Sequence, residues 1–292
     1  MKILFISKGD LPDYQCDSFF QGGRSLFGEN FIDANYIWYM YEDQKKLYWN
    51  TRIPDGGRSY GRGFTIAGSL KDINVNRTNL NQRILDKEFD LIIYGSCVRC
   101  TDYIQEVIQS YPPEKIIFID GEDDPKIRSH FLDYGHLFKR ELIKEYHPRL
   151  HSINFGIPES KIINKVPEKT QDWGTVIPGR MDTYVFFDEQ SYYKDYQNSY
   201  FALTHKKGGW DCMRHYEIMA NGCVPYFPDI ENCPELTMKT FPKSLCKEAI
   251  KMVESGEIDD TKYYNLANNF LNYTKENLTS KNIVNNLLSE IK

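Results

Sequence analysis

A chain of 292 residues exceeds the usual size of one compact domain, so its length predicts two domains that each bury a core. The hydrophobic share of 41% and the ordinary charge content exclude a disordered or fibrous chain. A net charge of −5 gives no global basic field, which argues against nucleic acid as an obligatory partner but leaves a local basic groove open.

The chain begins with the apolar run Ile3–Ile6, which is too short for a signal peptide, and no stretch of about 20 apolar residues follows. We therefore expect a cytoplasmic protein without a membrane span. Seven cysteines, an odd number, fit reduced thiols better than a disulfide framework. The single Cys-x-x-Cys motif at 97–100 lacks the second ligand pair of a structural zinc site, so the sequence predicts no bound metal.

The first half alternates strand-like and helix-like segments. Ile3–Ile6 and Leu91–Tyr94 are predicted to be buried parallel strands. Apolar residues at helical spacing predict a helix over 102–111, which Pro112-Pro113 end before the next strand, Ile116–Ile119. This alternation predicts an α/β fold with a doubly wound parallel sheet, in which ligands bind beyond the carboxyl ends of the strands.

Candidates for acceptor binding and proton transfer follow these strands. Clustered acids can raise one another's pKa values and create a general base, although the same run fits a solvated loop or a helix N-terminus. The acids are Asp120, Glu122, Asp123 and Asp124. The basic candidates are the glycine-flanked Arg24 and Arg62 and the pair Lys139-Arg140, for which surface turns or a solvated helix face are the alternative interpretations.

A polar stretch between Pro158 and Pro167 is predicted to separate the two domains, an N-terminal one over 1–160 and a C-terminal one over 161–292. The second half then continues with a predicted strand at 175–177 and a helix near 187–197. The next elements are a strand at 200–203, a helix after Trp210 that Gly222 ends in a left-handed conformation, and a strand at 224–227. From residue 243 onward the sequence is mostly helical.

The segment 199–230 contains the most informative pattern. A predicted strand, a glycine pair, the start of a helix and the next strand follow one another there with only short connections. Gly208-Gly209 allow close approach of a ligand to the backbone, Asp211 is a candidate helix N-cap and catalytic acid, and the first helical turn can hold a phosphate. Arg214 and Glu217, three residues apart, lie on one helix face, where a guanidinium suits a diphosphate and a carboxylate suits ribose hydroxyls. A simple surface ion pair is the alternative.

The order of strand, turn, Arg214, His215-Tyr216-Glu217 and Ala-Asn-Gly-Cys-Val-Pro resembles the donor-binding segment of GT-B glycosyltransferases, in particular the exostosin-like and family 1-like enzymes. The resemblance implies two Rossmann-like domains facing a cleft, with Arg214 at the diphosphate and Glu217 at the ribose. Val176–Arg180 resembles the strand-Gly-Arg turn that directs an arginine, here Arg180, towards the diphosphate. Gly209 stands eight residues before Glu217, where retaining relatives have a second glutamate, so the stereochemistry stays open.

We therefore predict a metal-independent glycosyltransferase that moves a hexosyl or pentosyl group from a nucleotide diphosphate sugar to a hydroxyl of a glycan or small molecule, without a further cofactor. The departing diphosphate is expected to meet basic side chains and the helix N-terminus, and His215 is a further contact candidate. The basic candidates are Arg180, Lys206, Lys207 and Arg214. Two alternatives stay open: a glycosyltransferase acting on modified DNA bases, as some phages encode, and a non-catalytic module that binds nucleotide sugars or carbohydrate.

Overall fold

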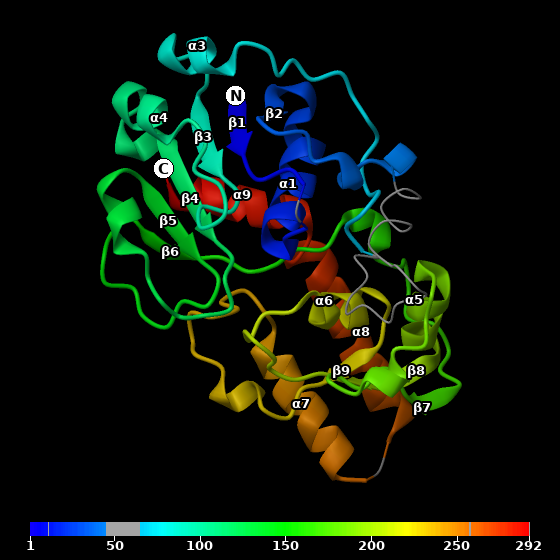
Figure 1. Ribbon diagram of the computed structural model, residues 1–292. Coiled ribbons are helices and arrows are strands. Elements are labelled where there is room, and N and C mark those ends of the chain that lie inside the picture. The colour runs from blue at the N-terminus through cyan, green and yellow to red at the C-terminus, as the bar shows by residue number, and fades with distance from the viewer. Residues whose placement is uncertain (11, 45–64, 257, 292) are drawn as a thin grey trace.

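The computed structural model describes residues 1–10, 12–44, 65–256 and 258–291, which form two α/β units side by side (Figure 1). Each unit contains its own parallel sheet. No helix in these ranges is long and apolar enough to cross a membrane.

The first sheet has six parallel strands in the order β2-β1-β3-β4-β5-β6. They are β1 (Ile3–Ile6), β2 (Phe31–Asp33), β3 (Leu91–Tyr94), β4 (Ile116–Asp120), β5 (His136–Lys139) and β6 (Leu150–Ser152). The three strands predicted in this half are confirmed, and β4 ends one residue later than expected. Since the order reverses between β1 and β3, ligands are expected beyond the carboxyl ends of these two strands.

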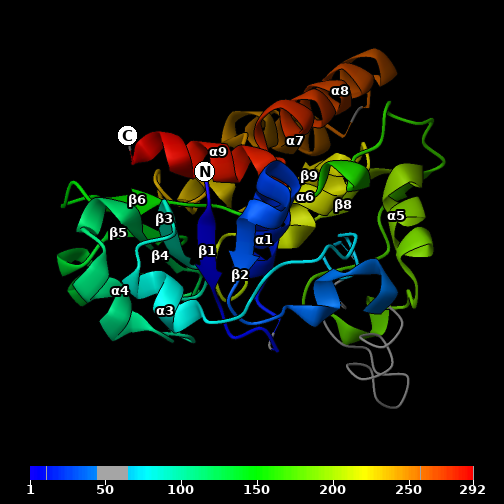
Figure 2. The same cartoon turned by 90° about the horizontal axis from the view of Figure 1, so that it is seen from above.

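Helices cover both faces of the first sheet (Figure 2). Ile3 and Phe5 of β1 share one core with α1 (Tyr14–Phe27) and α9 (Ser280–Glu290). Leu4 and Ile6 point to the other core, with α3 (Leu80–Leu85) and α4 (Ile104–Ser110). Because both faces are buried, β1, β3 and most of β4 are continuously apolar rather than alternating, which is the property that made these three strands recognisable in the sequence.

The second sheet consists of three parallel strands in the order β7-β8-β9. Its strands are β7 (Gln171–Trp173), β8 (Ser199–Leu203) and β9 (Val224–Tyr226), and its helices are α5 (Glu189–Asn198), α6 (Met213–Ala220), α7 (Lys243–Glu254) and α8 (Asp260–Asn277). As predicted, Gly222 follows α6 with a left-handed φ of 64°.

The predicted strand at 175–177 is wrong, because β7 lies four residues earlier. The carboxylate of Asp195 on α5 binds both the backbone N–H of Thr175, at 2.8 Å, and its hydroxyl, at 2.7 Å. These contacts tie Thr175 to a helix. Residues 175–177 therefore form a connection that leads from the sheet to the space between the two units.

The glycine-flanked Arg24 lies inside α1 rather than in a loop. Its guanidinium is buried and forms an ion pair with Asp33 at 2.6 Å. Gly22 has a packing function, because a Cβ there would overlap the backbone carbonyl of Ser280 at the start of α9. The missing side chain lets these two helices pack closely over the first sheet.

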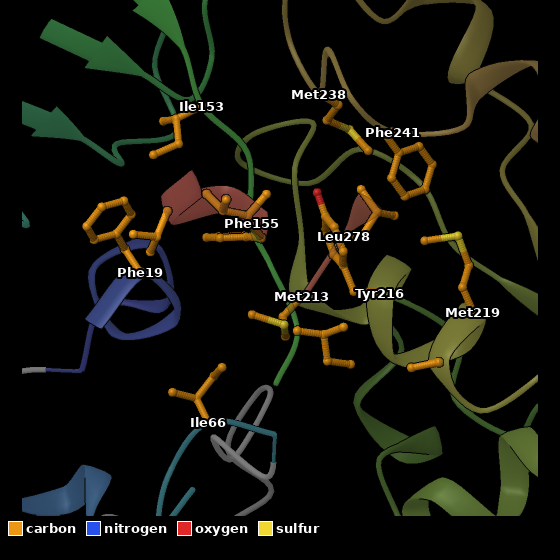
Figure 3. Close-up of a cluster of buried hydrophobic side chains, with 14 of the residues drawn as sticks. Phe19, Ile66, Ile153, Phe155, Met213, Tyr216, Met219, Met238, Phe241 and Leu278 are labelled. Carbon is orange, nitrogen blue, oxygen red and sulfur yellow. The ribbon is translucent and has the colours of Figure 1, made fainter. Parts of the chain in front are cut away.

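One apolar core continues from the first unit into the second (Figure 3). Phe19 of α1 and Ile153 after β6 belong to it, and so do Met213 of α6 and Met238 before α7. The predicted boundary at 160/161 falls between β6 and β7 and stays a prediction. The last helix, α9, returns to the first unit and packs on α1.

Gly22→Ala is expected to destabilise the protein by about 2 kcal/mol, because a methyl group would force α1 away from the backbone of α9. The loss should appear in urea unfolding even though alanine is the better helix former. Ser25→Ala, at an exposed position of the same helix, loses only its hydrogen bond with Gln21; it is the control and should lower the unfolding midpoint less. Equal midpoints for both variants would contradict the close packing inferred here.

Candidate functional site

A cavity of ≈ 390 Å³ lies between the two units, and residues of both line it. The first wall consists of Asp13, Gln15, Arg99, Asp123, Arg140 and Phe155, from the segments that follow β1, β3, β4, β5 and β6. The second wall consists of Val176, Tyr184, Tyr192, Lys207, Arg214 and Glu217. The cavity thus occupies the carboxyl ends of the strands in the first sheet, as expected for a doubly wound fold.

Arg214 lies in the first turn of α6 and is only 7% exposed. Its Nη2 donates to the hydroxyl of Tyr184 at 3.1 Å. Its Nη1 is buried and has no hydrogen-bond partner among the described residues. A buried donor on a charged group costs free energy unless it is satisfied, so this nitrogen marks a position where a ligand acceptor is expected.

The start of α6 adds further donors beside Arg214. Its N-cap is Cys212, which gives no side-chain hydrogen bond to the first turn. Cys212, Met213 and Lys207 also line the cavity, and burial and Arg214 lower the pKa of Lys207. Backbone N–H groups and two cationic side chains therefore meet at one end of the cavity, an arrangement that favours an anion.

Glu217 lies on the same face of α6, as the three-residue spacing predicted, and its carboxylate is held by hydroxyl groups. Thr65 donates to Oε1, and Tyr192 of α5 donates to Oε2 at 2.6 Å. Burial raises the pKa of Glu217, while these hydrogen bonds and Arg214 oppose the rise. The structure thus shows a carboxylate already suited to accepting two hydroxyl donors.

The pair Arg140-Glu141, directly after β5, joins the first unit to the loop before α6. Arg140 donates to the carbonyl of Asp211 at 2.6 Å and binds Asp123. Glu141 accepts from the backbone N–H groups of Trp210, at 3.0 Å, and Asp211, at 3.2 Å. Because both partners of the pair bind backbone groups, they fix the position of this loop without depending on its side chains.

Gly208 and Gly209 were predicted to admit a ligand, but the structure shows that they admit protein side chains. A Cβ on Gly208 would overlap the carboxylate of Asp123, and one on Gly209 would overlap that of Glu141. The sequence reasoning missed this because both carboxylates come from the other half of the chain. Both glycines nevertheless line the cavity.

Asp211 is not the N-cap of α6, which corrects the sequence-based prediction. Its buried carboxylate accepts from the N–H of Phe155 at 2.8 Å and from the hydroxyl of Tyr216 at 2.9 Å. Burial raises its pKa to about 6, against the opposing effect of Arg140. It lines the cavity, and its predicted catalytic role stays a prediction.

Four acids lie at the end of β4 and directly after it, and of these Asp123 lines the cavity and the other three do not. Asp120 is fully buried between Arg128, at 2.6 Å, and Lys139, at 3.0 Å, and these bonds explain why it stays inside the first unit. Glu122 binds Arg99 at 3.0 Å, and Asp124 binds Arg128. Asp123 is thus the member of the cluster whose position fits a role in the site.

The other predicted contact residues lie outside the lining of this cavity. Both ring nitrogens of His215 are engaged, with Thr204 at 2.8 Å and the carbonyl of Trp210 at 2.9 Å, and burial lowers its pKa to about 3. Arg180 is exposed beside Asp182, Lys206 lies over the ring of Trp210, and Arg24 and Lys139 are buried in ion pairs. Arg62 lies outside the described residues.

Sequence reasoning missed Asp13 and Gln15 at the start of α1. The carboxylate of Asp13 accepts from the N–H groups of Gln15 and Cys16 and from Ser96 after β3, at 2.9 Å. Asp13 therefore spans the point where the strand order reverses. The signal was present, since an acid a few residues after the first strand of a doubly wound sheet is a candidate for this position.

No protein-family model matches the sequence, and no curated protein matches it. Among solved structures, HepE of Anabaena in complex with UDP and glucose has a TM-score of 0.50 at 12% identity, covering 99% of this chain and 98% of its own. An α-glucosyltransferase in complex with UDP and a 13-mer DNA containing a HMU base has a TM-score of 0.49 at 11% identity. The match covers 100% of this chain and 99% of the α-glucosyltransferase. The likeness to HepE and the two parallel sheets facing a cleft show that this chain has the GT-B fold, as predicted.

Asp211→Asn is expected to alter how stability depends on pH. The folded state holds the Asp211 proton up to a pKa of about 6, so protonation stabilises the native protein most at low pH and this contribution is lost as pH rises through about 6. Asparagine can accept from Phe155 and donate to Tyr216, and it stays neutral. The unfolding free energy of the variant relative to wild type should therefore rise by on the order of 2 kcal/mol between about pH 4 and about pH 6. A difference that stays constant in urea titrations over this range would contradict the assignment.

Proposed function

We propose that this protein is a glycosyltransferase that moves a sugar from a nucleoside diphosphate sugar to a hydroxyl acceptor within the cavity between its two sheets. The observation that carries the proposal is the buried Nη1 of Arg214, which has no partner among the described residues and lies beside the start of α6. A buried guanidinium with a donor that has no partner among the described residues, next to the N-terminus of α6, suits a diphosphate.

The reaction places growing negative charge at this end of the cavity. The acceptor oxygen forms a bond to the anomeric carbon while the bond from that carbon to the diphosphate oxygen breaks. The electron pair leaves with the diphosphate, and the hydroxyl proton is released. Arg214, Lys207 and the first turn of α6 are positioned to stabilise the departing group, so these fixed charges and dipoles favour the transition state over the bound substrate.

The ribose is expected at Glu217. Thr65 and Tyr192 now donate hydroxyl hydrogens to this carboxylate, and two ribose hydroxyls can take their place with the same chemistry. HepE, which shares the fold, is described in complex with UDP and glucose, and this supports UDP-glucose as the first donor to test. The identity of the sugar, metal independence and a cytoplasmic location stay predictions.

A non-catalytic module with the same fold is the second candidate. Its distinguishing property is donor binding without any turnover, including the slow hydrolysis of the donor that water supports in a transferase. The acids around the cavity, Asp123 and Asp211, favour the enzyme because either can receive the proton of an attacking hydroxyl.

Arg214→Ala and Glu217→Gln should differ in their effects on UDP-glucose. Loss of Arg214 removes a contact to a group whose charge grows during bond cleavage, so turnover should fall by about 100-fold, more than donor affinity does. Loss of the Glu217 charge weakens a contact that is equal in both states, so Kd should rise about tenfold while maximal turnover changes less. Calorimetry with UDP and steady-state hydrolysis of UDP-glucose measure these two quantities.

Lys194→Ala removes one positive charge, as Arg214→Ala does, but at an exposed position of α5. It is the matched control for Arg214→Ala. It should leave binding and turnover at the wild-type values. If UDP binds none of the proteins, or if Arg214→Ala and Glu217→Gln behave like Lys194→Ala, the assignment of this cavity to the donor is wrong. Tight donor binding with no hydrolysis would favour the non-catalytic module.

A further inference from the structure

The first wall of the cavity contains a buried amide whose oxygen lacks a partner. Gln15, in the first turn of α1, is 1% exposed and lines the cavity. Its Nε2 reaches the carbonyl of Asn154 at 3.4 Å, whereas Oε1 has no hydrogen-bond partner among the described residues. Such an oxygen lowers the stability of the fold, and a bound hydrogen-bond donor would recover this loss. The amide therefore marks a position for an O–H or N–H group of a ligand.

The charges on the same wall are paired with one another. Arg99 lies 3.3 Å from Asp13 and binds Glu122, and Arg140 binds Asp123 and backbone carbonyls. The lining of this wall thus has two cations and two carboxylates in internal pairs. A phosphate group would have to break one of these pairs, whereas an uncharged hydroxyl compound can bind without disturbing them.

Aromatic rings border the unpartnered amide. Tyr14 and Phe155 both line the cavity and make an edge contact with ring centroids 6.5 Å apart. The guanidinium carbon of Arg140 lies 4.8 Å from the centroid of the Phe155 ring, so Arg140 covers one face of this ring. Ring surfaces beside a few polar acceptors are a common way to bind sugars, which present apolar C–H faces and hydroxyl edges.

We propose that Gln15 Oε1 on the first wall accepts a hydrogen bond from a hydroxyl group of the acceptor, and that this acceptor is an uncharged, sugar-like compound. This inference rests on the proposed function, because the sugar is delivered from the second wall, where the unpartnered Arg214 donor lies. Gln15 then acts as a substrate-binding residue that selects the acceptor and takes no part in donor binding. Duplex DNA with a modified base is the competing acceptor class.

The variant that tests this inference is Gln15→Met, which keeps the length of the side chain and removes the amide. Gln21→Met is the matched control, because Gln21 is also buried on α1 but binds Ser25 at 3.2 Å and does not line the cavity. With UDP-glucose as donor, transfer to octyl glucoside, octyl galactoside and octyl mannoside is measured beside hydrolysis of the donor. Gln15→Met should raise the acceptor KM about tenfold, and by more than it raises the KM of UDP-glucose hydrolysis, whereas Gln21→Met should leave both values near those of the wild type.

A second readout separates binding from a structural role. If Gln15 served only the fold, its replacement would lower Tm, whereas loss of an unpaired buried oxygen should leave the Tm of the ligand-free protein equal or higher. A lower Tm for Gln15→Met than for Gln21→Met would overturn the proposal.

The acceptor panel supplies the remaining outcomes. Transfer to none of the octyl glycosides, equal acceptor KM values in the two variants, or transfer only to duplex DNA that contains hydroxymethyluracil would each overturn the acceptor assignment. Wild-type hydrolysis of UDP-glucose keeps these outcomes distinct from failure of the proposed function. If that hydrolysis is absent and UDP does not bind, the donor assignment fails and the acceptor assignment fails with it.

Discussion

The contact of Arg140 and Glu141 with the backbone at 210–211 is the constraint on which the cavity depends. Both residues follow β5 of the first sheet, and the groups they bind lie directly before α6 of the second unit. The guanidinium is buried and shared between a carbonyl and Asp123, so it is electrically compensated. Together with the hydrogen bond from Phe155 to Asp211 and the shared apolar core, this pair holds the start of α6 against the carboxyl ends of the first sheet, so that the two walls enclose one space.

The two walls differ in how their charges are used. Arg99 and Arg140 on the first wall are paired with carboxylates, whereas Arg214 on the second wall keeps one buried nitrogen without a partner among the described residues. The carboxylate of the second wall, Glu217, accepts hydrogen bonds from hydroxyl groups and forms no ion pair with Arg214 within 4.0 Å. The positive charge of Arg214 on the second wall is therefore available to a bound anion, whereas the positive charges on the first wall are neutralised by carboxylates. The proposed assignment of a donor end and an acceptor end rests on this difference in charge.

The local sequence pattern was sufficient to predict β1, β3 and β4 of the first sheet and the shared helix face of Arg214 and Glu217. Both predictions depend only on the spacing of residues within one element. It failed for β7, since Asp195 on α5 holds Thr175 away from the sheet. It gave no sign that Gly208-Gly209, which line the cavity, also lie against Asp123 and Glu141 from the other half of the chain. Gln15 was missed for the same reason: a missing hydrogen-bond partner is a property of the surroundings and leaves no trace in a single sequence.

The return of α9 to the first sheet has a consequence for the order of folding. Gly22 on α1 contacts Ser280, so a close contact of the first unit joins residues more than 250 positions apart. During synthesis, the face of α1 that receives α9 stays uncovered until the whole second unit has left the ribosome. Contacts of such long range slow folding, and uncovered apolar surface is open to aggregation in the meantime. Completion of the core between α1 and α9 therefore has to wait for the last helix.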